Sequence, residues 1–143
     1  MIRGGTVPPM TTSHDTGADL DPALDALIGR FVAAIQAGDV ATVREIYAPD
    51  AAIWHNFDER EQTVDENVVT LADLHRRATG LEYTEIQRFA SPGGLVEQHV
   101  LIGQAKGGPL RMPAMIRFWV EDGRITRLEE YLDTRQALVL YQG

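Results

Sequence analysis

Three residues in the second half of the chain have side chains suited to proton transfer. Glu97 and His99 stand two positions apart in a run of residues typical of a β-strand, and Glu130 lies in a later run of the same kind. Side chains two positions apart on a strand share a face, with about 6.5 Å between them. An imidazole beside a carboxylate can act as a general acid and base. We therefore predict acid–base chemistry by His99 and Glu130, with Glu97 beside them.

Three helices are predicted in the first half of the chain, over residues 22–37, 40–48 and 64–79. Each follows a residue whose side chain can cap a helix, namely Asp21, Asp39 and Thr63. The first helix has apolar residues at three- and four-residue steps, which is the pattern of a helix with one buried face. The third has Glu66 three positions after Thr63, which completes a capping box.

Five strands are predicted, over residues 51–57, 81–90, 95–104, 110–120 and 125–133. Short turns join the last four, so these are expected to be consecutive antiparallel neighbours. Three amphipathic helices cannot all pack flat on one twisted sheet. We therefore predict an α+β domain over residues 20–143, in which a cone-shaped, curved antiparallel sheet wraps around the helices and leaves a pocket at its open end. Residues 1–19 have little to bury and are predicted to form a disordered tail.

Composition excludes several classes of function. The formal net charge of −8 argues against proteins that bind nucleic acid or anionic lipid through a basic face. No apolar run approaches the roughly 20 residues of a membrane span. The chain has no cysteine, so it can form no disulfide and no thiolate metal site. This composition fits a reducing compartment, the N-terminus has no signal-peptide pattern, and we expect a cytoplasmic protein.

Alternation along the strands sorts side chains between the pocket and the outer face. The more apolar face of strand 110–120 is expected to line the pocket and consists of Met112, Ala114, Ile116 and Phe118. Pairing across the turn at 106–109 gives Glu97 and His99 the same inward side. On the first strand, the same alternation turns Trp54 and Asn56 inward and His55 away.

Two segments carry a resemblance to a known family. Residues 30–56 read RFVAAIQAGDVATVREIYAPDAAIWHN, and residues 115–134 read MIRFWVEDGRITRLEEYLDT. With the order of the elements, they resemble the nuclear transport factor 2-like superfamily, particularly its SnoaL-like branch. The resemblance implies the cone-shaped fold, a cystatin-like α+β barrel, and a pocket for a small apolar ligand. Its members include isomerases, epoxide hydrolases, dehydratases, polyketide cyclases and proteins that only bind.

The family pattern implies further pocket residues. It gives the inward side of the last strand to Leu128, Glu130 and Leu132. In ketosteroid isomerases a tyrosine and an aspartate form the oxyanion hole, and Phe31 and Ile116 occupy these positions here. Both donors are therefore missing, and steroid isomerisation by that mechanism is not expected. His55 falls on the position of the isomerase base.

Limonene-epoxide hydrolases of the same fold use an Asp-Arg-Asp set, with a tyrosine and an asparagine that hold the attacking water. The corresponding positions here are His99, Glu97 and Glu130, with Trp54 and Asn56 as the water-holding pair. An acid at the arginine position argues against epoxide hydrolysis, and the Trp54 indole cannot accept a hydrogen bond from water. The set still suits acid–base work, with Asn56 as an orienting amide.

Two functions follow as hypotheses. The first is an enzyme without a cofactor, an isomerase, lyase, cyclase or hydrolase of small apolar compounds, that uses His99 and Glu130. The second is a protein of the same fold that binds a small ligand or acts as a dimeric accessory subunit, without catalysis.

Several alternatives stay open at the level of single residues. His55 can replace Trp54 and Asn56 as the inward residue of its strand, because a bulge would reverse the alternation. A metal site of His55, His99 and Glu130 is conceivable, but no local spacing supports it, and we expect no metal. A homodimer through the outer face of the sheet is expected from the family and from the outward residues Met115 and Trp119.

Overall fold

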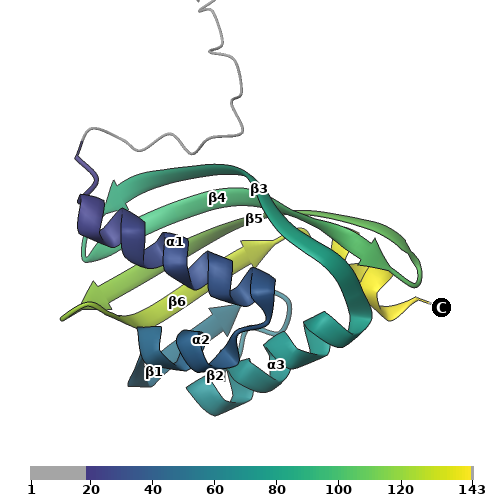
Figure 1. The fold of residues 1–143 in the computed structure, drawn as a ribbon, viewed down its shortest axis with the longest axis horizontal. Coiled ribbons are helices and arrows are strands. Elements are labelled where there is room, and N and C mark those ends of the chain that lie inside the picture. Colours follow the sequence, from purple (N-terminus) through teal and green to yellow (C-terminus); the bar gives the residue numbers. More distant parts are fainter. Residues whose placement is uncertain (1–18, 143) are drawn as a thin grey trace, which may run out of the picture.

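The computed structural model of the chain describes residues 19–142. The tail predicted over 1–19 therefore lies, except for its last residue, outside the described residues. In chain order the elements are α1 (Pro22–Ala37), α2 (Val40–Ile46), β1 (Tyr47–His55), β2 (Glu61–Gln62), α3 (Val64–Arg77), β3 (Ala78–Ser91), β4 (Gly94–Ala105), β5 (Gly108–Glu121), β6 (Arg124–Leu132) and a terminal 3₁₀ helix, η1 (Gln136–Tyr141) (Figure 1).

One six-stranded sheet runs through the molecule in the order β2-β1-β6-β5-β4-β3. Its second half, from β3 to β6, is the predicted antiparallel meander with tight turns between neighbours. The first strand adds to the other edge of this meander, where β1 runs parallel to β6. The short strand β2 then pairs with β1 in the antiparallel direction. The sheet is thus antiparallel except at the β1–β6 junction, which brings the middle of the chain beside its last strand.

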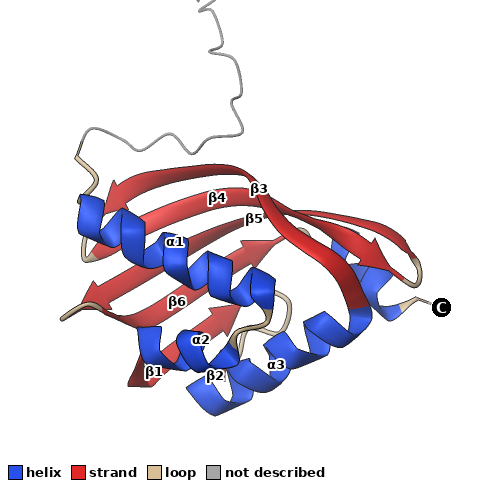
Figure 2. Cartoon of the chain, viewed as in Figure 1, coloured by secondary structure: helices blue, strands red, loops and turns tan. Residues whose placement is uncertain are grey.

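The three helices lie on one face of the curved sheet (Figure 2). Helix α1 crosses the strands, and β3 bends around to meet the end of α3. Phe31 of α1 packs edge-on against Tyr47 and Phe118, with ring centroids 5.2 and 5.7 Å away. This core fixes α1 at one end of the sheet, and the predicted α+β architecture is confirmed. Among residues 19–142, no helix has both the length and the apolar character needed to cross a bilayer.

The predicted starts of the helices are confirmed at atomic level. The Asp21 carboxylate accepts a hydrogen bond from the backbone N–H of Ala23, and Thr63 and Glu66 form the expected capping box. The predicted end of the third helix is wrong by two residues, because Ala78 is already extended and pairs with Ala105 on β4. Strand pairing therefore replaces the last half-turn of helix.

The long strand β3 bends through two irregularities of its pairing with β4. One lies between Thr79 and Glu82, where Gly80 has a φ of 62°, a value that glycine adopts without strain. The other lies between Thr84 and Gln87, where Glu85 has a φ of 53°. Bulges of this kind increase twist and bend a strand, so they curl the edge of the sheet towards α3.

Candidate active site

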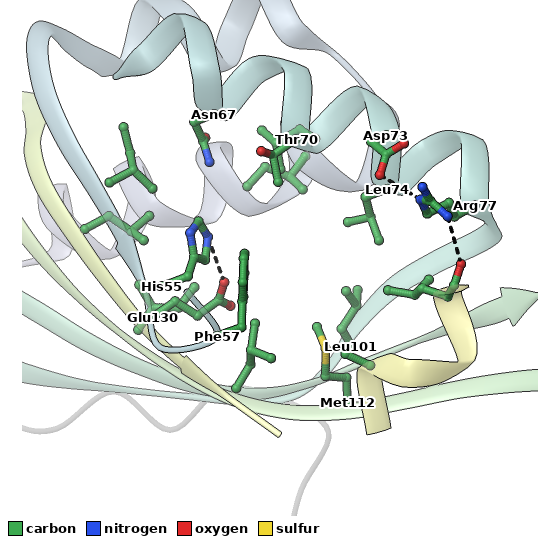
Figure 3. A pocket seen from close by; sticks show the side chains of 18 of the residues that line it. His55, Phe57, Asn67, Thr70, Asp73, Leu74, Arg77, Leu101, Met112 and Glu130 are labelled. Carbon is green, nitrogen blue, oxygen red and sulfur yellow. Dashed lines mark hydrogen bonds and ion pairs between the residues drawn. The ribbon is translucent and has the colours of Figure 1, made fainter. Parts of the chain in front are cut away.

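A cavity of about 410 Å³ lies between α3 and the concave face of the sheet. Figure 3 shows its residues: His55, Phe57 and Glu130 lie at one end, and Asp73 and Arg77 of α3 lie at the other. Most of its wall is apolar and comes from Phe31, Ile35, Ile53, Leu71, Leu74, Leu101, Met112, Ile116, Leu128, Leu132, Leu138 and Leu140. A cavity of this size and character suits one small, mostly apolar molecule.

The polar centre of the cavity is a pair formed by His55 and Glu130. These residues are direct neighbours in the parallel pairing of β1 and β6, so their side chains leave the sheet on the same face. The His55 Nε2 lies 3.3 Å from the Glu130 Oε1. The ring of Phe57 stacks on the imidazole at 5.0 Å between centroids, and His55 is buried. The pair is thus held on the wall of an apolar chamber.

The surroundings of His55 assign the proton of its neutral ring. Its Nδ1 is buried and makes no hydrogen bond with any residue from 19 to 142. A proton on Nδ1 would be a buried donor without an acceptor, at a cost of about 1–3 kcal/mol. The proton therefore belongs on Nε2, where the Glu130 carboxylate is the acceptor within reach. The carboxylate makes no other polar side-chain contact with the described residues.

The negative charge of Glu130 affects the pKa values of two tyrosines that line the cavity. Burial, and then the negative charge of Glu130, raise the pKa of Tyr47 above its ordinary value. The pKa of Tyr83 is raised by the same causes in the same order, with further contributions from Glu97 and Tyr47. Both phenols therefore keep their protons at neutral pH. The Tyr47 hydroxyl donates a hydrogen bond to the Asn67 Oδ1 at 3.0 Å.

Glu97 and His99 form a second pair, which is fully buried. The His99 Nδ1 lies 2.6 Å from one oxygen of Glu97, and the other oxygen accepts a hydrogen bond from the Arg88 Nε at 2.8 Å. The Arg88 Nη1 donates in turn to the Asp25 side chain at 2.9 Å and to its backbone carbonyl. Glu97 and His99 point inward, as predicted, but they lie behind the cavity wall and do not line it.

The predicted orientation of the first strand is wrong. His55 is buried and faces the cavity, whereas Trp54 lies on the outer face against Tyr131, with 5.2 Å between ring centroids. Asn56 does not line the cavity: its side chain exchanges two hydrogen bonds with the backbone of Leu132, at 3.1 and 3.2 Å. The alternative with His55 inward is the correct one. No hairpin joins β1 to β6, so no turn indicates which side chains of β1 face inward. The buried Ile53 lies on the same face of the strand as His55 and indicates the observed orientation.

The other sequence predictions for the cavity hold in part. Six of the predicted residues line it, namely Phe31, Met112, Ile116, Leu128, Glu130 and Leu132. Ala114 and Phe118 point inward and are buried, but Phe118 belongs to the core beneath α1 and neither residue lines the cavity. Arg117 stacks on Trp119 outside the cavity, at 4.3 Å.

Sequence reasoning missed several important residues. Tyr47 falls inside the predicted second helix but is the first residue of β1. Arg88 has no predicted role, although pairing back from the turn at Ser91–Gly94 places it directly opposite Glu97. Asn67 and Tyr83 carry no sequence signal that separates them from surface positions. Among residues 19–142, no three His, Asp or Glu side chains are grouped closely enough to hold a metal ion.

Comparison with known proteins places the chain in a family. A sequence profile described as the SnoaL-like domain matches residues 28–128. No curated protein matches the sequence significantly. Solved structures share the fold at low sequence identity.

IdmH of Streptomyces antibioticus, to which polyketide cyclase activity has been ascribed, is 19% identical, with a TM-score of 0.72 over 82% of this chain and 97% of IdmH. An LEH-like epoxide hydrolase of M. tuberculosis is 20% identical, with a TM-score of 0.68 over 83% of this chain and 90% of the hydrolase. PrhC of Penicillium brasilianum is 14% identical, with a TM-score of 0.71 over 82% and 85% of the two chains. The matching profile covers well over half of the sequence, and the chain belongs to the SnoaL-like family, with the cone-shaped nuclear transport factor 2-like fold.

Proposed function

We propose that this protein is an acid–base enzyme acting on a small, mostly apolar molecule, with Glu130 as the base and His55 as its partner. The observation that carries the proposal is the 3.3 Å contact between these side chains on the wall of an apolar cavity. His55 thereby takes the place that the sequence had suggested for His99. The reaction is of the isomerase, lyase, cyclase or hydrolase type, the range of chemistry found in the family.

The chemistry of the pair follows from its surroundings. Glu130 is a carboxylate on the wall of an apolar cavity, where it can act as a base towards a bound molecule. The Nε2 of His55 holds one carboxylate oxygen in place and leaves the other directed to a ligand. Glu130 can therefore take a proton from a carbon atom beside a carbonyl group, or from a water molecule.

The test uses a probe that reports a base in an apolar site, nitrobenzisoxazole. When a base removes its ring C–H proton, the N–O bond breaks and a coloured cyanophenolate forms. We expect Glu130→Gln to slow this elimination by about 10²-fold, the lower end of typical general-base contributions. The matched control is Glu129→Gln, because Glu129 is the adjacent residue and pairs with Arg127 outside the cavity.

The alternative is a protein of the same fold that binds a small ligand without catalysis. It predicts that wild type and Glu130→Gln eliminate the probe at the same rate, although the cavity still binds apolar compounds. Equal rates in the two proteins would therefore contradict the enzymatic proposal and support the binding one.

We also propose that two copies of the chain form a homodimer and that the protein is cytoplasmic. The outer face of the sheet exposes Met115 and Tyr131, which pair across β5 and β6, and Trp54 packs beside Tyr131. Exposed apolar patches on a sheet are frequent at protein interfaces. We expect twice the chain mass in solution and a monomer for Met115→Glu. A monomeric wild type would contradict the proposed dimer.

A further inference from the structure

Tyr83 is a cavity phenol whose hydroxyl has no hydrogen-bond partner among residues 19–142. It lies on β3 opposite Leu101, which is also an inward residue that lines the cavity. Tyr47 differs in this respect, because its hydroxyl is already engaged by Asn67. Tyr83 is partly buried and lines the cavity, so its hydroxyl is open to a partner supplied by a ligand.

Tyr83 is contacted at its backbone and at its ring. Its backbone N–H donates to the side-chain oxygen of Gln36 on α1 at 3.0 Å. Its ring meets the imidazole of His99 edge to face, with 4.7 Å between centroids and 84° between planes. A hydroxyl on a ring fixed in this way can bind a ligand atom without losing much conformational freedom.

The buried pair behind the cavity fixes His99 in turn. Its imidazole is bonded to Glu97, and Glu97 is bonded to Arg88. Buried charges are costly, and a set that is fully paired has few alternative arrangements. The chain of contacts from Arg88 through Glu97 and His99 therefore ends at the Tyr83 ring.

We propose that the Tyr83 hydroxyl is the hydrogen-bond donor for an oxygen atom of the substrate, so that the cavity selects neutral ketones or similar oxygenated compounds over hydrocarbons. This inference rests on the proposed function. In the reaction, Glu130 takes a proton from the carbon beside the carbonyl, and the C–H electrons form a carbon–carbon double bond. The carbonyl π electrons move onto oxygen, and Tyr83 stabilises the resulting charge while keeping its own proton.

The charged groups that line the cavity support Tyr83 as the donor and a neutral molecule as the substrate. Burial and the nearby Glu130 carboxylate raise the pKa of Tyr83, so its hydroxyl stays a donor over the physiological range. A carboxylate on the substrate would be repelled by the Glu130 carboxylate. The Arg77 guanidinium at the far end of the cavity would not offset this repulsion, because it already donates hydrogen bonds to the Asp73 side chain and the Leu140 carbonyl. The cavity therefore suits a neutral substrate.

The test compares two ligands of the same shape, β-tetralone and its parent hydrocarbon tetralin. The quantity compared is the ratio of the two dissociation constants, corrected for the different solubilities of the two ligands in water. We expect the wild-type protein to bind the ketone about 10-fold more tightly than the hydrocarbon on this corrected scale, as one hydrogen bond allows. Tyr83→Phe keeps the ring and its contact with His99, so it should bind tetralin normally and bring the ratio close to one. Tyr131→Phe, which removes an exposed hydroxyl on the outer face, is the control.

Two results would overturn the inference: a wild-type protein without preference for the ketone, or a Tyr83→Phe protein that keeps it. Binding requires no proton transfer, so Glu130→Gln should retain the preference even though elimination of nitrobenzisoxazole is slowed. A ketone preference that depends on Tyr83, together with unchanged elimination in Glu130→Gln, would leave the donor site standing and contradict the proposed base.

Discussion

Residues 19–142 contain two histidine–glutamate pairs, and the surroundings of the two pairs differ. The carboxylate of Glu97 is bonded on both oxygens, to His99 and to Arg88, and is completely buried. The carboxylate of Glu130 is contacted on one oxygen only, by His55, and borders a cavity. The same two residue types thus form a closed, fully buried pair in one place and an open pair beside a cavity in the other, and we propose the open pair as the reactive one. The two pairs differ in whether both oxygens of the carboxylate already have a polar partner among the described residues.

The largest expected effect comes from opening the closed pair. Arg88→Met leaves the Glu97 carboxylate buried without its cation, which should lower the free energy of unfolding by about 3–5 kcal/mol. Urea denaturation measures this loss. The control is Arg111→Met, because Arg111 pairs with Glu85 on the surface and such pairs contribute about 1 kcal/mol or less. A similar small loss for Arg88→Met would show that the buried pair does not depend on its arginine.

The same substitution in both pairs sharpens the comparison. Glu97→Gln removes charge-assisted hydrogen bonds to two buried partners, and we expect a loss of about 2 kcal/mol in unfolding free energy. Glu130→Gln interrupts one 3.3 Å contact beside a cavity, so its stability should stay within about 1 kcal/mol of the wild type. Equal losses in the two variants would remove the distinction between a structural and a reactive pair.

The open pair also depends on the backbone clasp made by Asn56. Its side-chain amide bonds both the N–H and the carbonyl of Leu132, two residues after Glu130. Asn56→Ala should therefore destabilise the fold by about 1–2 kcal/mol and also slow elimination, because the end of β6 is no longer held. Asn56→Asp keeps the acceptor and should recover part of both. An Asn56→Ala variant with normal stability and rate would exclude a role for the clasp.

The smallest effect concerns the two cavity tyrosines at high pH. Burial and the Glu130 charge raise the pKa of Tyr47 and of Tyr83. Below the unfolded value of about 10 both states hold these protons, so stability is unaffected there. Above it only the unfolded chain releases them, and the free energy of unfolding should fall by up to about 1.4 kcal/mol per pH unit for each tyrosine. Tyr47→Phe should reduce the slope of unfolding free energy against pH. An unchanged slope would contradict a raised pKa of Tyr47 in the folded protein.

The sequence predicts the meander better than the first strand, for a physical reason. Tight turns at both ends of β4 and β5 fix their register, so the inward positions of Glu97, His99, Met112 and Ile116 follow from counting residues. Strand β1 joins the sheet by parallel pairing with a strand far along the chain, and its pairing shifts between Tyr47 and Ala52. No turn sets its phase. The buried aliphatic Ile53 was a better guide to that phase than the larger Trp54.

The roles of the side chains were harder to predict than their directions. His99 and Glu97 face inward as expected, yet whether they reach the cavity depends on Tyr83, which stands between His99 and the ligand space. Tyr83 lies between the two irregularities of β3, and alternation along a strand cannot reveal where such irregularities place a side chain. The sequence therefore indicates an imidazole beside a carboxylate on the inner face of the sheet, whereas the histidine–glutamate pair that lines the cavity is His55 and Glu130.

The rate of nitrobenzisoxazole elimination by Glu130→Gln, relative to the wild type, tests the central claim most directly. If Glu130 is the base, the rate falls by about 10²-fold, while the free energy of unfolding measured on the same preparation stays near the wild-type value. A rate within about twofold of the wild type would contradict the account, because the open pair would then not be the reactive one.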